Sequence, residues 1–63
     1  MSESNAYVAR DRKEELVLKD VASTEPQGEK VALKGVLGHA TEVKARLLKM
    51  DFMEHKILLE EIA

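Results

Sequence analysis

An alternating pattern of apolar and charged residues along Glu42–Leu59 constrains the fold more than any other part of this sequence. Its first half places an apolar side chain at every second position, at Val43, Ala45 and Leu47. This is the period of a strand with one buried face. The apolar phase then slips by one residue and resumes at Leu48, Met50 and Phe52. The slip predicts a β-bulge, because one extra residue keeps the apolar groups on the same face.

The second half of this segment predicts a hairpin. Polar residues at 54–56 separate the alternating run from Ile57–Leu59, so we expect the turn near Met53–His55. A helix is the alternative, since Leu, Lys, Glu, Met, Ala and Arg are good helix formers and no Gly or Pro follows Gly38. Glu54 or His55 would interrupt the apolar stripe of such a helix at its middle. Composition and periodicity alone leave both interpretations open.

Turn signals divide the rest of the chain into short segments. The clearest turn is Pro-Gln-Gly at 26–28, because Pro presets φ and Gly tolerates positive φ. We expect Ala6–Ala9 and Glu14–Asp20 to pair as a hairpin around a charged turn at 10–13. Lys30–Lys34 alternates cleanly after the Pro-Gln-Gly turn. Five or six short strands with regularly spaced turns are typical of a small all-β barrel or sandwich, and we expect one domain over residues 1–63.

The alternation also predicts which side chains form the interior. The expected core consists of apolar residues on the inward phase of each strand: Val8, Leu16, Leu18, Val31, Leu33, Val43, Leu47, Met50, Phe52, Ile57 and Leu59.

The length limits how stable a single copy can be. A chain of 63 residues without cysteine has a small core and no disulfide. We therefore expect a homodimer. The net charge of −2, with both signs mixed along the chain, and the presence of just two aromatic residues, Tyr7 and Phe52, argue against a nucleic-acid partner. No segment approaches the ~20 apolar residues of a membrane span, so we expect a cytoplasmic protein.

Candidates for catalysis are scarce. His39 follows Gly38 at an expected turn and His55 lies at the expected hairpin tip, so each is most simply a solvated turn residue. A two-histidine metal site has no supporting motif such as HExxH. Ser2 could act as a nucleophile only with a base and an orienting group, and the sequence arranges neither. The residues by themselves therefore predict a protein that is not an enzyme.

The order of several weak motifs resembles the CooT family of small nickel-binding proteins, whose members are also described as predicted RNA-binding proteins. The resemblance covers nearly the whole chain and lies in MSESNAYV at 1–8, EELVLKDV at 14–21, E-P-x-G-x-K-V-x-L at 25–33, and the end from Glu42-Val43 through Met50-Asp51-Phe52 to His55-Lys56-Ile57. It implies a small SH3-like β-barrel of antiparallel strands that assembles as a homodimer. It also implies one Ni(II) ion held at the dimer interface by the two N-termini, and a role in maturing a nickel enzyme such as carbon monoxide dehydrogenase.

Two positions depart from the family pattern. The family ligands are a cysteine at position 2 and the backbone nitrogens of the first two residues, so the implied metal site here is Met1 and Ser2. A serine hydroxyl stays protonated at neutral pH and cannot replace a thiolate. We therefore expect weak or absent nickel binding. Residues 36–39, Val-Leu-Gly-His, also differ from the family, which tends to carry an aromatic residue and then an acid after the glycine. The alternative function is an RNA-binding or protein-interaction module built on the barrel surface.

Overall fold

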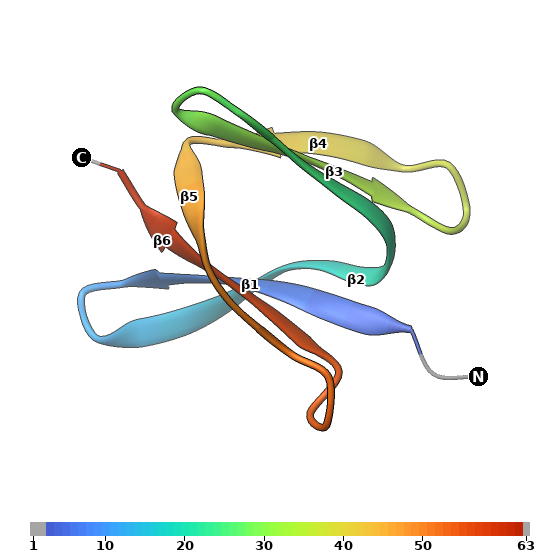
Figure 1. Cartoon of the computed structure of the whole chain (residues 1–63), viewed down its shortest axis with the longest axis horizontal. Coiled ribbons are helices and arrows are strands. Elements are labelled where there is room, and N and C mark those ends of the chain that lie inside the picture. Colours follow the sequence, from blue (N-terminus) through green and yellow to red (C-terminus); the bar gives the residue numbers. More distant parts are fainter. Residues whose placement is uncertain (1–2, 63) are drawn as a thin grey trace.

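The chain folds into six β-strands and no helix over residues 3–62, the part that this computed structural model describes. The strands are β1 (Ser4–Arg10), β2 (Lys13–Gln27), β3 (Lys30–Gly35), β4 (Ala40–Val43), β5 (Ala45–Asp51) and β6 (Lys56–Glu61). They form one sheet in the order β4-β3-β2-β1-β6-β5, which curls into a half-barrel (Figure 1). The all-β prediction is confirmed, and the helical alternative for Glu42–Leu59 is wrong. The described residues contain no helix long and apolar enough to cross a membrane.

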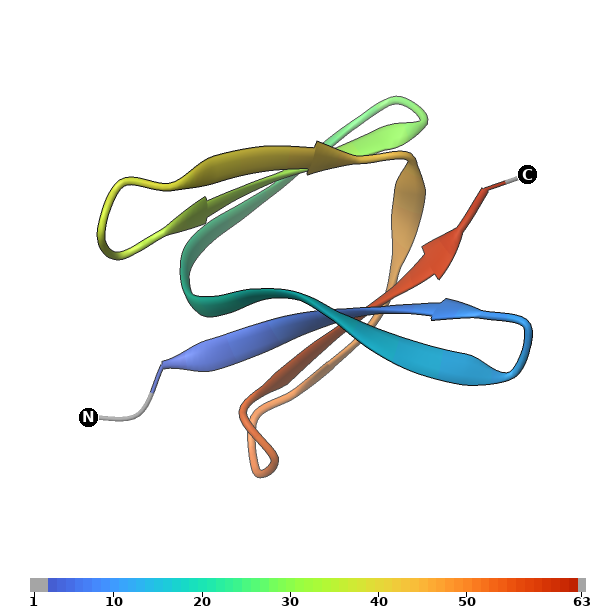
Figure 2. The same ribbon diagram turned by 180° about the vertical axis from the view of Figure 1, so that it is seen from behind.

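The curl follows from the connection between β4 and β5. These strands are consecutive in the chain and separated by Lys44 alone, yet they lie at opposite edges of the sheet. A flat sheet could not be spanned by one residue, so the two edges must approach each other (Figures 1 and 2). The Ile62 N–H donates to the Lys44 carbonyl over 3.1 Å and fastens the end of the chain at this corner.

One strand pair departs from the expected antiparallel arrangement. β1 and β6 pair in parallel, with Tyr7 opposite Leu58 and Val8 opposite Leu59, whereas the other neighbouring strands are antiparallel. This pairing joins the two ends of the chain and needs no tight turn. Local turn chemistry therefore could not reveal it, because parallel neighbours are connected through distant segments.

The turns match hairpin geometry, with one shift from the expected position. Asp11 and Arg12 both have positive φ, as the two central residues of a type I′ turn require. In the next hairpin Gln27 pairs with Lys30, so the loop is residues 28 and 29. Gly28 takes the positive φ of a type II′ turn. Pro26 and Gln27 thus belong to β2 and not to the turn.

The core is smaller than the alternation predicted. Its buried members are Ala6, Val8, Val21, Val31, Leu33, Ala45, Ile57 and Leu59, with Leu18 and Val43 partly buried against them. The prediction of burial is wrong for four residues, which are exposed: Leu16, Leu47, Met50 and Phe52. The predicted core also lacked three residues that are buried: Ala6, Val21 and Ala45.

Position along β5 explains why two of these predictions failed. Leu47 lies opposite the buried Leu59, and Met50 opposite the buried Ile57, so both point to the expected face. The register shift at Leu48 confirms the predicted bulge. Only the start of β5 approaches β3, and Ala45 there is fully buried, whereas Leu47 and Met50 lie further toward the β5–β6 turn and are 38% and 44% exposed. Phe52 fails for a different reason, because it lies in the β5–β6 turn.

Candidate functional site

The start of β1 is the place where the expected metal residues join the fold. Met1 and Ser2 lie outside the described residues, and β1 begins at Ser4.

Hydrogen bonds of Asn5 connect the start of β1 to the β5–β6 turn and to the bend of β2. Its backbone N–H donates to the His55 carbonyl over 2.9 Å, and its side-chain Oδ1 accepts from the Asp20 N–H over 3.1 Å. The Asp20 carbonyl in turn accepts from the Val36 N–H over 2.9 Å. Asp20 has a positive φ at the bend of β2, and such a residue needs local support. The start of β1 thus lies between the β5–β6 turn and the β3–β4 turn.

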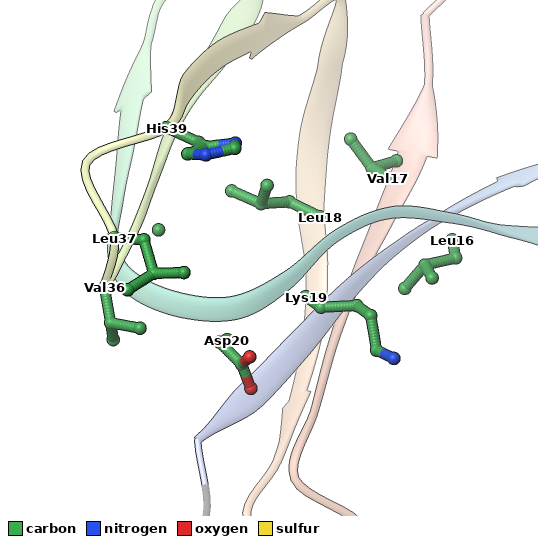
Figure 3. Close-up of a pocket in the computed structure, with 9 residues that line it drawn as sticks. Leu16, Val17, Leu18, Lys19, Asp20, Val36, Leu37 and His39 are labelled. Carbon is green, nitrogen blue, oxygen red and sulfur yellow. The ribbon is translucent and has the colours of Figure 1, made fainter.

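A shallow apolar groove lies between the first half of β2 and the β3–β4 turn. It has a volume of about 350 Å³. Its apolar walls are Leu16, Leu18, Val36 and Leu37, with His39, Lys19 and Asp20 at the margin (Figure 3). Leu37 is 84% exposed, and the turn that carries it is closed by the Gly38 N–H donating to the Gly35 carbonyl. This turn is the segment that departs from the family pattern.

The β5–β6 turn presents a second apolar feature. Asp51 Oδ1 accepts from the backbone N–H groups of Met53 and Glu54, at 3.1 and 2.9 Å. The bond from Glu54 is the main reason that the pKa of Asp51 lies below its ordinary value. With the backbone held in this way, Phe52 is 77% exposed and Met53 is 90% exposed. Two large apolar side chains therefore project from a well-anchored turn.

The two histidines lie on separate turns, the β3–β4 turn and the β5–β6 turn. His39 and His55 are both exposed turn residues. Within residues 3–62 no group of three or more His, Cys, Asp or Glu side chains could hold a metal ion. The donors at the N-terminus fit poorly as well, since Ser2 offers a neutral hydroxyl where a nickel thiolate site needs sulfur. The residues of this chain thus do not match the thiolate site that the family resemblance implies.

The aromatic side chain of Tyr7 is held by a neighbouring lysine. Tyr7 is half-buried, and the Lys56 ammonium lies 5.3 Å from the centre of its ring. Lys56 also forms an ion pair with Glu14, and this contact raises the pKa of the ammonium. Tyr7 is thus engaged within the protein, and the other aromatic residue, Phe52, stands alone at a turn.

Comparison with known proteins places the chain in a family. The model for the CO dehydrogenase accessory protein CooT matches residues 1–60. The chain belongs to the CooT family. An uncharacterized protein from Archaeoglobus fulgidus is 42% identical over 43 residues, which are 68% of this chain and 96% of that protein. The crystal structure of a candidate CooT from Carboxydothermus hydrogenoformans superposes with a TM-score of 0.87 at 31% identity, covering 97% of this chain and 98% of the other.

Membership in CooT confirms the resemblance drawn from the sequence motifs. It also supports a role as an accessory protein to CO dehydrogenase, and not as a catalyst. Sequence reasoning missed Asn5 and the groove. Asn is a residue that often bonds to nearby backbone, but its partner Asp20 lies 15 positions away and no local pattern connects the two.

Proposed function

We propose that this CooT protein is a cytoplasmic homodimer that assists maturation of a nickel-dependent CO dehydrogenase, with its own N-terminal nickel site impaired by Ser2. The observation that carries the proposal is the match of the CooT model over residues 1–60. The protein contributes binding and no catalysis, since CooT is an accessory protein.

Ligand chemistry supports the impaired site. An α-amine, a deprotonated amide and a thiolate together suit a tetragonal or square-planar Ni(II) ion. Ser2 leaves the amine, an amide that resists deprotonation and a neutral hydroxyl. Ligands must lose their protons to bind, and a serine hydroxyl does not do so at neutral pH. The role of this chain then depends more on protein contacts than on holding the metal tightly.

Nickel titration tests this part of the proposal. Three proteins with a native N-terminus are compared by calorimetry and by the thiolate charge-transfer absorption: the unmodified chain, Ser2→Cys, and Ser2→Cys extended by one residue before Met1. We expect weak binding for the first, tight binding of one nickel per two chains for the second, and loss of that binding for the third, because the extension converts the α-amine into an amide.

A double variant, His39→Ala with His55→Ala, serves as the control for loose surface binding, because imidazole suits nickel. If the unmodified chain binds nickel as tightly as Ser2→Cys and the extension has no effect, the N-terminal site is refuted. Loss of that tight binding in the double histidine variant would then place the metal on the histidines.

A protein-interaction module is the second candidate function, and the exposed apolar side chains favour it. Val36, Leu37, Phe52 and Met53 are all on turns and all at least 49% exposed. Exposed apolar residues that adjoin one another, as Val36 and Leu37 do and as Phe52 and Met53 do, are typical of protein contact sites. RNA binding has less support, because Lys and Arg number 10 against 12 acids and no basic stripe accompanies the aromatic residues. A gel shift at low salt should show no RNA complex.

A further inference from the structure

The two walls of the apolar groove lie on opposite sides of the bend in β2. One wall, Leu16 and Leu18, belongs to the part of β2 that precedes the bend. The other wall, Val36 and Leu37, belongs to the β3–β4 turn (Figure 3). Asp20 forms the bend itself and has a φ of 52°. The backbone conformation of this one residue therefore influences how far apart the two walls lie.

Two hydrogen bonds of the Asp20 backbone connect the bend to its neighbours. The Asp20 carbonyl accepts from the Val36 N–H over 2.9 Å, and this bond joins the bend to the second wall. The Asp20 N–H donates to Asn5 Oδ1 over 3.1 Å, and this bond joins the bend to the start of β1. The side chain of Asn5 is thus connected through Asp20 to Val36.

The bend is strained and lies at the surface, so it can open at low cost. A positive φ is unfavourable for a residue with a side chain and persists where surrounding contacts enforce it. Asp20 is exposed, so water can replace the bonding partners of its backbone, and opening leaves no buried polar group unpaired. Asn5 is itself held in place, because its backbone N–H donates to the His55 carbonyl over 2.9 Å.

We propose that Asp20 is the hinge of the groove and that Asn5 is the latch that holds it closed. When the Asn5 side chain releases the Asp20 N–H, the strained φ relaxes, the Asp20 carbonyl turns away from the Val36 N–H, and the two walls separate. The width of the groove is then controlled from the start of β1. This conformational device goes beyond the proposed function and depends on neither nickel binding nor the oligomeric state.

Amide hydrogen exchange of the unmodified chain, measured by NMR at low urea concentrations, tests whether one opening breaks both bonds. The Asp20 and Val36 N–H groups should have protection factors within about threefold of each other and the same dependence on urea. That dependence should exceed zero, because separated walls expose apolar surface, and should be smaller than for the buried Leu33 on β3. Unequal protection of the two amides, or exchange that does not respond to urea, would overturn the proposal.

Two variants separate the latch from general stability. Asn5→Ala removes an acceptor that is engaged only in the closed state. Exchange at the Val36 N–H should therefore accelerate by about 2- to 12-fold, the range for loss of one hydrogen bond. Ile57→Val is the matched control, because Ile57 is buried in the core and its contacts persist when the bend opens. It should accelerate exchange at Leu33 and leave exchange at Val36 as in the unmodified chain.

Asn5→Asp keeps an oxygen acceptor and should return exchange at Val36 toward the rate of the unmodified chain. The proposal is wrong if Asn5→Ala leaves the Val36 rate unchanged, because the two bonds of Asp20 are then independent. It is also wrong if Ile57→Val accelerates Val36 as much as Leu33, because Val36 then exchanges only when the whole fold opens. If Asn5→Ala does not fold, the unmodified chain and Ile57→Val still decide the question.

Discussion

Leu59→Ala is the substitution that tests most directly where the core of this CooT protein lies. Leu59 is fully buried on β6, and its strand pairs with β1 on one side and β5 on the other. Removing a buried leucine side chain beyond Cβ costs about 2–5 kcal/mol, from lost burial and from the cavity left behind. A chain of this length has a total stability of roughly 3–9 kcal/mol, so the change removes a large share of it.

Leu48→Ala is the matched control, because it makes the same chemical change on the neighbouring strand. Leu48 is the bulged residue and is 51% exposed. Leu48→Ala removes three carbon atoms that are about half buried and leaves no cavity. The expected loss of stability is therefore about 1 kcal/mol. Urea unfolding followed by circular dichroism measures both values. The melting temperature should fall several-fold further for Leu59→Ala than for Leu48→Ala.

Ile57→Val keeps the experiment informative if Leu59→Ala does not fold. Ile57 is 4% exposed, and loss of one methylene there should cost about 0.5–1.5 kcal/mol. Equal costs for Leu59→Ala and Leu48→Ala would refute the placement of the core. A loss of about 3 kcal/mol on Phe52→Ala would do the same, because Phe52 is 77% exposed.

Three further predictions concern turns and the β1 start. Arg12→Gly should stabilise the fold by about 0.5–1 kcal/mol in urea unfolding, because Arg12 has a φ of 64° that glycine adopts without strain. Asn5→Ala should cost about 0.5–1.5 kcal/mol by the same measurement, since it removes the acceptor of the Asp20 N–H. Asp51→Ala should destabilise at pH 7 but progressively less below pH ~4, as thermal melts across pH would show. The folded state lowers the pKa of Asp51 through the Glu54 N–H, so its contribution is present above the unfolded pKa and is lost on acidification.

Each of these has a control that isolates the cause. Arg12→Ala keeps the positive-φ strain, so a gain equal to that of Arg12→Gly would refute the turn argument. Asn5→Asp keeps an oxygen acceptor and should recover most of the stability lost in Asn5→Ala. A destabilisation by Asp51→Ala that is the same at pH 7 and pH 2.5 would show that the ionised carboxylate is not what holds the turn.

The sequence by itself determined the direction in which side chains point. Period-two alternation and a one-residue slip in Glu42–Phe52 predicted strands, a bulge and a hairpin, and the structure confirms the bulge at Leu48 and the turn at residues 52–55. Val31 and Leu33 are each 1% exposed, as the alternation in β3 predicted. These features are local, because they depend on which face a residue takes along its own strand.

The candidate site could be predicted only in part. The motifs placed the expected metal residues at Met1 and Ser2, which lie outside the described residues, and the impairment of that site by Ser2 stays a proposal. The groove and the role of Asn5 could not be foreseen, because Asn5, Asp20 and Val36 meet through contacts between distant segments.

Tertiary structure alone decided which inward faces are covered. Leu47 and Met50 have the right phase for a core, but they remain exposed because they lie beyond the start of β5, where Ala45 on the same face is fully buried close to β3. Leu59 has the same phase and is fully buried, since β1 and β5 flank its strand. The position of a residue in its own strand determines which face of the sheet its side chain is on. Its burial depends on other strands that are distant in the sequence and pack against that face. In this fold those strands arrive through the parallel pairing of β1 with β6 and the corner at Lys44, and neither leaves a local signature in the sequence.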